Sequence, residues 1–168
     1  MIETIIEYEN GGKIDVYQLV DKEASDYKKV FACCDYFAKQ GAITVITPSF
    51  QVQTIGNPIY EKIYASLKGT QYWGRCPDFT VNGVWYEHEG YDETKDLTDP
   101  QKRADTFCWM MKRGVKQSER IIVEDCLFGR RWARKVIYNR VHIEKQKIKE
   151  VYIRTSDSLE LLYKKEAG

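Results

Sequence analysis

The chain has 168 residues with 43% hydrophobic and 13% aromatic side chains, enough apolar material to bury the core of one domain. Its longest apolar runs are far shorter than the ~20 residues that span a bilayer, and its start, Met1-Ile2-Glu3-Thr4, lacks the pattern of a secretory signal. We therefore expect no membrane segment and a cytoplasmic protein. The five cysteines have no CxxC spacing, which favours buried thiols over a disulfide framework or a zinc site.

The net charge of +1 conceals an asymmetry along the chain. Residues 1–100 contain 9 Lys+Arg and 16 Asp+Glu, a balance of −7, whereas residues 101–168 contain 17 and 9, a balance of +8. A basic C-terminal part is typical of proteins that bind a polyanion. A solvated surface of mixed charge explains the counts equally well.

Turn and cap residues divide the first part of the chain into short elements. Asn10-Gly11-Gly12 predicts a tight turn between two strands, and Asp21 predicts the N-cap of an amphipathic helix that ends at Gly41. A β-branched run that ends at Pro48 predicts a further strand. The expected elements are strands 2–8 and 14–20, helix 22–40, strand 42–47 and helix 59–67.

The second part of the chain continues the alternation. Asn82-Gly83 predicts a hairpin, Asp99 and Pro100 begin a helix, and Ser156-Asp157-Ser158 predicts the turn of a closing hairpin. The expected elements are strands 79–81 and 84–88, helix 100–114, strand 120–126, helix 130–139 and strands 148–155 and 159–163. We expect an α/β (α+β) fold with a central mixed sheet flanked by helices, in one domain made of an N-terminal hairpin, 1–20, and a core, 21–168.

The hairpin of residues 78–89 carries the densest set of ionisable groups. Side chains alternate along a strand, so Glu87 and Glu89 share one face and His88 points to the other. If Asp78 lies near the two glutamates, three carboxylates converge, which is the donor set that Mg²⁺ or Mn²⁺ prefers. A solvated strand face is the simpler alternative.

The pattern Pro77-Asp78, a short gap and Glu87-x-Glu89 resembles the PD-(D/E)xK nuclease motif, with Glu89 where the motif has lysine. Over residues 23–163 the chain also resembles the C-terminal tRNA nuclease domains of contact-dependent growth inhibition toxins. That likeness rests on the order of Phe37-Ala38-Lys39-Gln40-Gly41, strand 43–46, Pro77-Asp78-Phe79, Trp85-Tyr86-Glu87, Lys116-Gln117-Ser118-Glu119-Arg120 and strand 121–123. The resemblance implies a nuclease-like core in which Asp78, Glu87 and Glu89 hold a metal and His88 lies beside them.

A second similarity is to metal-free ribonucleases of the barnase, EndoU, colicin and RelE-like group. In this alternative His142 acts as general base, and the groups that polarise the phosphate and the 2′-hydroxyl are Arg140, Arg154, Thr155 and Ser156.

A cationic helix face is predicted at Arg130, Arg131, Arg134 and Lys135, with Trp132, Val136 and Ile137 turned inward. Lys112, Arg113, Lys116 and Arg120 could extend this face, and Tyr72 and Trp73 in a loop could stack on an unpaired base.

Together these patterns predict a metal-dependent nuclease acting on RNA, with tRNA favoured by the resemblance, of a kind found in bacterial toxins and mobile elements. An inhibitor protein is a possible further partner. The alternative is a non-catalytic module that keeps the nuclease-like fold and binds nucleic acid or a protein.

Overall fold

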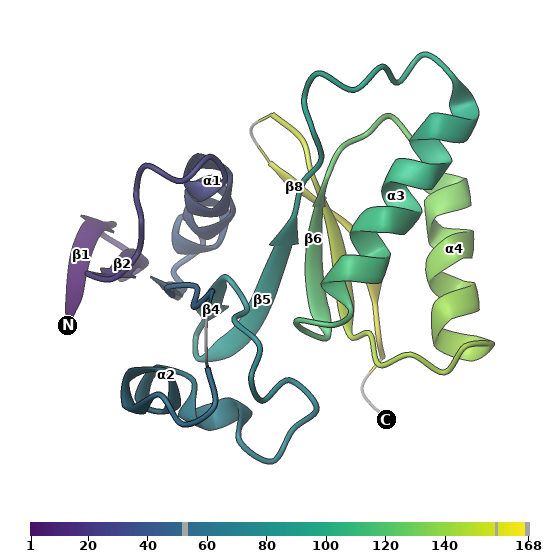
Figure 1. Ribbon diagram of the computed structural model, residues 1–168. Helices are drawn as coiled ribbons and strands as arrows, with labels where there is room; N and C mark the ends of the chain where they lie inside the picture. The colour runs from purple at the N-terminus through teal and green to yellow at the C-terminus, as the bar shows by residue number, and fades with distance from the viewer. Residues whose placement is uncertain (52–53, 157, 167–168) are drawn as a thin grey trace. The chain divides into compact units, whose positions relative to one another are not determined.

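The computed structural model describes residues 1–51, 54–156 and 158–166, which form two compact units divided between Tyr86 and Glu87. Eight strands pair in chain order into one mixed sheet, and the described residues add four α-helices, so the α/β fold predicted from the sequence is confirmed (Figure 1). The division falls inside strand β5 (Val84–Glu89), whose first three residues pair with β4 and whose last three pair with β6. The single domain predicted from the sequence stays a prediction, and each unit is described by itself.

Unit 1 is built on the N-terminal hairpin and the strands that extend it. Its elements are β1 (Ile2–Glu7), β2 (Lys13–Tyr17), α1 (Tyr27–Ala38), β3 (Ile43–Ile46), α2 (Pro58–Ile63), a 3₁₀ turn (Ala65–Leu67) and β4 (Phe79–Val81). The hairpin β1–β2 is antiparallel, β2 and β3 are parallel with α1 as their connection, and β4 pairs antiparallel with β3 and β5. Residues 1–20 therefore belong to the same unit as β3.

Helix α1 begins at Tyr27, five residues later than predicted. The Asp21 carboxylate accepts a hydrogen bond from the Glu23 amide at 2.9 Å, and the Asp21 carbonyl accepts one from the Ala24 amide. A short polar side chain bonded to a nearby amide offers the backbone an alternative to the helix. Asp21 thus forms a turn ahead of the helix, and Asp26 occupies the N-cap position.

An aromatic cluster forms part of the core of unit 1. The rings of Tyr60 and Tyr64 stack with centroids 4.8 Å apart, and Tyr64 stacks on Trp85 at 4.9 Å. Tyr72 is buried in this cluster and Trp73 is half-buried against it. Tyr72 lies in a loop as predicted, but it is buried, so the prediction that it is exposed and could stack on an unpaired base was wrong.

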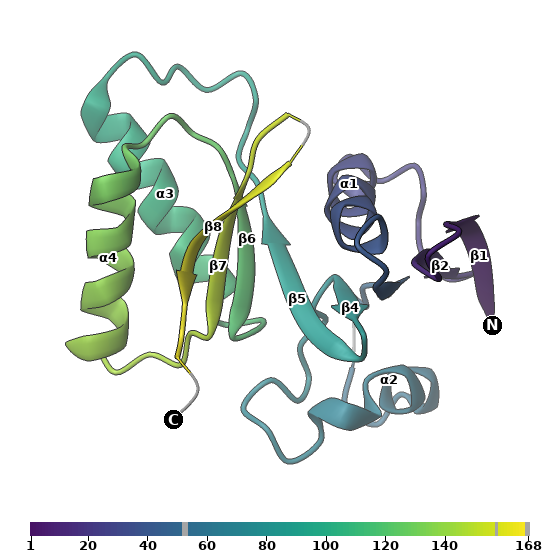
Figure 2. The ribbon, with the colours of Figure 1, turned by 180° about the vertical axis from the view of Figure 1, so that it is seen from behind.

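Unit 2 is a parallel three-strand arrangement closed by one antiparallel strand. It contains the second half of β5, then α3 (Pro100–Gly114), β6 (Arg120–Glu124), α4 (Arg130–His142), β7 (Glu150–Arg154) and β8 (Leu159–Lys164). Strands β5, β6 and β7 are parallel, and β8 returns antiparallel to β7. Helix α3 connects β5 to β6, and α4 connects β6 to β7. The two helices lie side by side on one face of these strands (Figures 1 and 2), as expected when both connections between parallel strands are right-handed.

The core of unit 2 lies between this sheet face and the two helices. Asp99 caps α3 by accepting from the Gln101 amide, and Pro100 follows, as the sequence predicts. At the other end of α3, a Cβ on Gly114 would lie 2.7 Å from Ile121 Cγ2, so glycine permits close contact of helix and strand. The buried core residues are Phe107, Met110, Met111, Ile121, Val123, Cys126, Ala133, Ile137, Ile148, Val151, Ile153 and Leu162.

Candidate functional site

The second half of β5 places its three ionisable side chains on two faces of unit 2. Glu87 and Glu89 stand in register with Ile121 and Val123, which belong to the core under the helices, and His88 stands in register with Ile122. Because side chains alternate along a strand, the two glutamates point toward the helices and His88 points away from them. All three residues are at most 7% exposed.

Glu89 is held by the last turn of α3. The Arg113 Nε lies 3.2 Å from a Glu89 carboxylate oxygen, and the Arg113 guanidinium also lies 4.7 Å from the centre of the Trp109 ring. Position 89, where the nuclease motif has lysine, thus carries a carboxylate whose charge is balanced by an arginine from another element.

On the opposite face, Glu124 at the end of β6 joins two neighbouring strands. The carboxylate of Glu124 lies 2.8 Å from His88 Nε2, and it accepts two hydrogen bonds from Arg154, at 2.6 and 2.7 Å. Burial raises the pKa of the Glu124 carboxyl, but the hydrogen bonds from His88 and Arg154 outweigh that effect and lower the pKa to about 2. We call His88, Glu124 and Arg154 the Glu124 cluster.

The Glu124 cluster lies at the carboxyl ends of parallel strands, where α/β sheets usually carry their functional groups. A carboxylate bonded to one imidazole nitrogen fixes the orientation of the ring, which suits a histidine that transfers a proton. Sequence reasoning missed Glu124, although a charged residue at the end of the apolar run of residues 121–123 was a usable signal.

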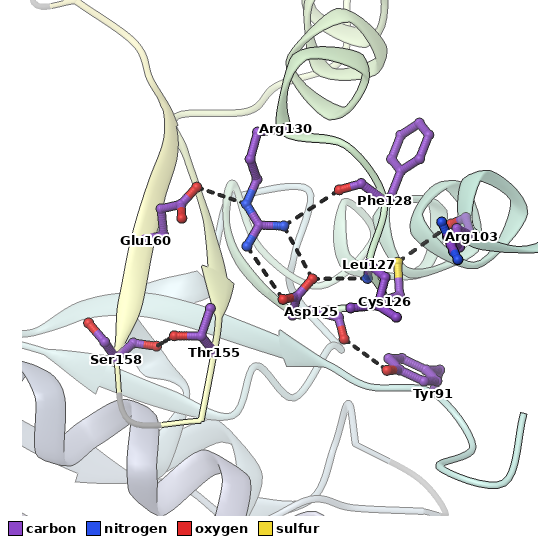
Figure 3. A network of polar contacts seen from close by, with 10 residues as sticks. All are labelled: Tyr91, Arg103, Asp125, Cys126, Leu127, Phe128, Arg130, Thr155, Ser158 and Glu160. Atoms are coloured by element: carbon purple, nitrogen blue, oxygen red, sulfur yellow. Dashed lines mark hydrogen bonds and ion pairs between the residues drawn. The ribbon is translucent and has the colours of Figure 1, made fainter. Parts of the chain in front are cut away.

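A second ion-pair network follows β6 (Figure 3). The Arg130 guanidinium lies 3.2 Å from Asp125 Oδ1 and 2.9 Å from Glu160 Oε2, and the hydrogen bond with Asp125 is the main reason why the pKa of Arg130 is raised. Asp125 also accepts from the Leu127 amide, and its carbonyl accepts from the Tyr91 hydroxyl. Arg130 is thus engaged by two acids and separated in role from the other cations of α4.

The outer face of α4 is cationic and aromatic. Helix α4 contains five Lys or Arg residues and no Asp or Glu, and Arg131, Arg134 and Lys135 are exposed. Trp132 is 55% exposed, so the prediction that it turns inward was wrong. Val136 is half-buried and Ile137 is buried. We define the α4 face as Arg131, Trp132, Arg134, Lys135, Tyr138 and His142.

The fully buried residues of α4 are Ala133 and Ile137, and these two side chains mark the side of the helix that faces the core. A helix turns by ~100° per residue, so Trp132 lies about 100° from Ala133 and outside the narrow buried stripe. Its ring instead lies 5.8 Å from the Arg131 guanidinium and 5.5 Å from the Lys135 ammonium. The aromatic side chain is therefore part of the charged surface.

The other predicted phosphate ligands differ in their surroundings. Lys112 and Lys116 are exposed, at the end of α3 and just after it. Arg120 is paired with Glu150 at 2.6 Å and with Glu119 at 3.3 Å. Arg120 therefore contributes to strand pairing more directly than to an exposed basic surface.

The residues of the metal-free alternative are not brought together. His142 is the last residue of α4, and Arg140 bonds to Gln146 at 2.9 Å and to the Cys108 carbonyl at 3.3 Å. Arg154 is the last residue of β7 and Thr155 follows it, whereas α4 ends on the side where β7 begins, because a helix that connects two parallel strands must return to the start of the second strand. Thr155 bonds to the Ser158 carbonyl. Asp157 in the predicted closing turn lies outside the described residues.

Asp78, the remaining predicted metal ligand, belongs to unit 1. Its amide donates to the Tyr86 carbonyl and its carbonyl accepts from the Thr47 amide, which fixes it at the start of β4. It lines a pocket of about 80 Å³ together with Asp21 and Asp26.

The carboxylates of Asp78, Glu87 and Glu89 are of the donor type that Mg²⁺ accepts, but one oxygen of Glu89 is engaged by Arg113. Among the residues that the structure describes, no group of three or more His, Cys, Asp or Glu side chains is arranged to hold a metal ion. Because Asp78 and the two glutamates belong to different units, their shared metal site stays a prediction from the sequence.

Known proteins give no information on this site, because none of those compared is similar to the chain. No family model, no curated protein and no solved structure matches it. Within the described part of the chain, none of the helices is long and apolar enough to cross a membrane.

Proposed function

We propose that this protein binds RNA through the α4 face and cleaves the bound strand. The observation that carries the proposal is the α4 face, which gathers exposed Arg131, Arg134 and Lys135 around an exposed tryptophan on a helix without acidic residues. Phosphates are held by such faces through charge, and aromatic rings add contacts to bases.

The groups proposed for cleavage lie on β5 and β6. Glu87 and Glu89, on the helix side of β5, would supply carboxylate oxygens, whereas His88, which Glu124 positions on the other face of the strand, would move a proton at a separate point and not beside the two glutamates. In the metal-dependent form of the proposal, Asp78 joins the two glutamates, and Mg²⁺ or Mn²⁺ supplies the charge that stabilises the leaving oxygen.

The cellular setting of the proposal follows from the resemblance to toxin nuclease domains. The favoured substrate is tRNA, the expected compartment is the cytoplasm where tRNA is found, and an inhibitor protein would protect the cell that makes the enzyme. A binding module that retains the fold without chemistry is the alternative, and the cleavage assay below separates the two.

Binding is tested by titrating labelled RNA with the full chain at several salt concentrations. Arg131→Ala/Lys135→Ala should lower the slope of log K against log salt by ~1.4 on single-stranded RNA, because each lost phosphate contact removes ~0.7. Lys164→Ala, an exposed lysine on β8, is the matched control and should leave the slope unchanged. No binding by the unaltered chain would refute the proposal.

Cleavage is tested by incubating the same RNA with Mg²⁺ or Mn²⁺, with and without a chelator. Glu87→Gln removes a charge at nearly constant size and should reduce the rate at least ~100-fold while binding persists. Glu7→Gln, at an exposed position of β1, is the control. Cleavage that persists with chelator but is lost in His142→Ala would support the metal-free mechanism. RNA binding without cleavage under any of these conditions would support the binding module.

A further inference from the structure

Exposed aromatic side chains on the helices of unit 2 occur in pairs with cationic or imidazole groups. Trp132 lies 5.5 Å from the Lys135 ammonium, the Tyr138 and His142 rings have centroids 4.3 Å apart, and Arg113 covers Trp109. Trp132 and Tyr138 are 55% and 57% exposed, so most of each ring faces solvent. Each pair on α4 offers one flat surface and one adjacent group that can meet a phosphate.

We propose that the α4 face selects single-stranded RNA, whose unpaired bases stack on Trp132 and Tyr138 while Arg131 and Lys135 hold the phosphates between them. This inference rests on the proposed function, because it names the substrate class of the same surface. An unpaired base presents its flat face to a ring, whereas a base inside a duplex is already covered on both sides by its neighbours.

The spacing of the two rings suits a strand that crosses the exposed side of the helix obliquely. Positions 132 and 138 are separated by six residues, which corresponds to ~9 Å along the axis and ~120° around it. Arg131, Lys135, Tyr138 and His142 follow a spacing of three and four residues and so form one stripe, with Trp132 beside it. Cations and rings therefore alternate along the path of the strand.

Trp132 and Tyr138 are not needed to hold α4 against the core of unit 2. The buried side of α4 is provided by Ala133 and Ile137, with Val136 and Val141 partly buried against the same core. Contacts between residues three or four apart on a helix contribute only a few tenths of a kcal/mol. Large apolar rings left exposed among cations, with no acid on the helix, are the composition of a single-strand binding surface.

Two kinds of variant separate stacking from charge. Trp132→Ala/Tyr138→Ala should weaken binding to single-stranded RNA at least ~25-fold, since each stacked base contributes at least about fivefold, and should leave the salt slope unchanged. Binding to a duplex of the same length should change less than about twofold. Leu161→Ala, an exposed apolar residue on β8, is the control for lost surface, and thermal unfolding checks that each variant is folded.

Arg131→Ala/Lys135→Ala should instead weaken both forms of RNA and lower both salt slopes. If the ring variant loses nothing, or loses as much on duplex as on single-stranded RNA, the selection for single strands is overturned while the proposed binding stands. If the unaltered chain binds neither form, both proposals fail. A ring variant with a changed salt slope would also overturn the stacking role.

Discussion

The Glu124 cluster and the α4 face place charged side chains of unit 2 in opposite environments. In the Glu124 cluster the side chains of His88, Glu124 and Arg154 are 2%, 10% and 16% exposed, and the carboxylate is bonded to both partners. On the α4 face Arg131, Arg134 and Lys135 are open to solvent, beside a tryptophan that is itself more than half exposed.

This contrast shows how the same residue types serve different ends. A buried charge has lost its hydration, and that cost is no longer offset when its partner is removed. Substitutions in the Glu124 cluster should therefore lower the free energy of unfolding. An exposed charge keeps its hydration and is screened by salt, so the α4 face should control binding and contribute little to stability. Variants of the two regions should therefore differ in stability and in RNA binding.

The largest expected effect is on the stability of the Glu124 cluster. Glu124→Ala removes a buried carboxylate from the half-buried Arg154 guanidinium and should lower the free energy of unfolding by ~3–5 kcal/mol. Urea denaturation followed by circular dichroism measures the change. Glu160→Ala, which removes an exposed acid paired with Arg130, should cost less than ~1 kcal/mol. Equal losses in the two variants would show that burial does not distinguish them.

The pH dependence of stability gives a second test of the Glu124 cluster. The pKa of Glu124 is about 2 in the folded protein, below the ordinary 4.5, so its contribution is complete above pH ~5 and is lost as pH falls toward 2. Lowering this pKa from 4.5 to about 2 corresponds to roughly 3 kcal/mol. Urea midpoints measured between pH 6 and pH 2 should therefore fall more steeply for the unaltered chain than for Glu124→Gln. Parallel curves would contradict the assigned pairing.

A smaller effect should separate two neighbouring arginines of α4 in RNA binding. Arg131→Ala should weaken single-stranded RNA binding by about fivefold and lower the salt slope by ~0.7. Arg130→Ala should leave the slope nearly unchanged, because Asp125 and Glu160 already engage that guanidinium. Salt-dependent anisotropy titrations of both variants decide the matter, and a larger slope change for Arg130 would reverse the assignment.

The smallest expected effect is on the stability of α4-face variants. Trp132→Ala and Lys135→Ala should each change the free energy of unfolding by less than ~0.5 kcal/mol, because both side chains are exposed and alanine favours the helix. The same urea experiment provides the measurement. A loss above ~2 kcal/mol would place the tryptophan in the core and remove the contrast with the Glu124 cluster.

Local chemistry in the sequence determined much of the secondary structure. Asp99 and Pro100 fixed the start of α3, and Gly114 ends it as predicted. Asn82 and Gly83 adopt positive φ angles of 49° and 82° in the turn that pairs β4 with β5. The alternation of strands and helices also predicted the α/β class, because caps, tight turns and side-chain periodicity act over a few residues.

The partners of the charged residues were decided only by the tertiary structure. Glu124 meets His88, 36 residues away, and Arg154, 30 residues away, because the parallel register of β5, β6 and β7 brings their ends together. The same long-range packing engaged Arg130 with Glu160 and buried Tyr72 in unit 1. Helical spacing grouped the cations of α4, but which of them stay exposed depended on the sheet and helix packed against it, since burial is a property of neighbours distant in the chain.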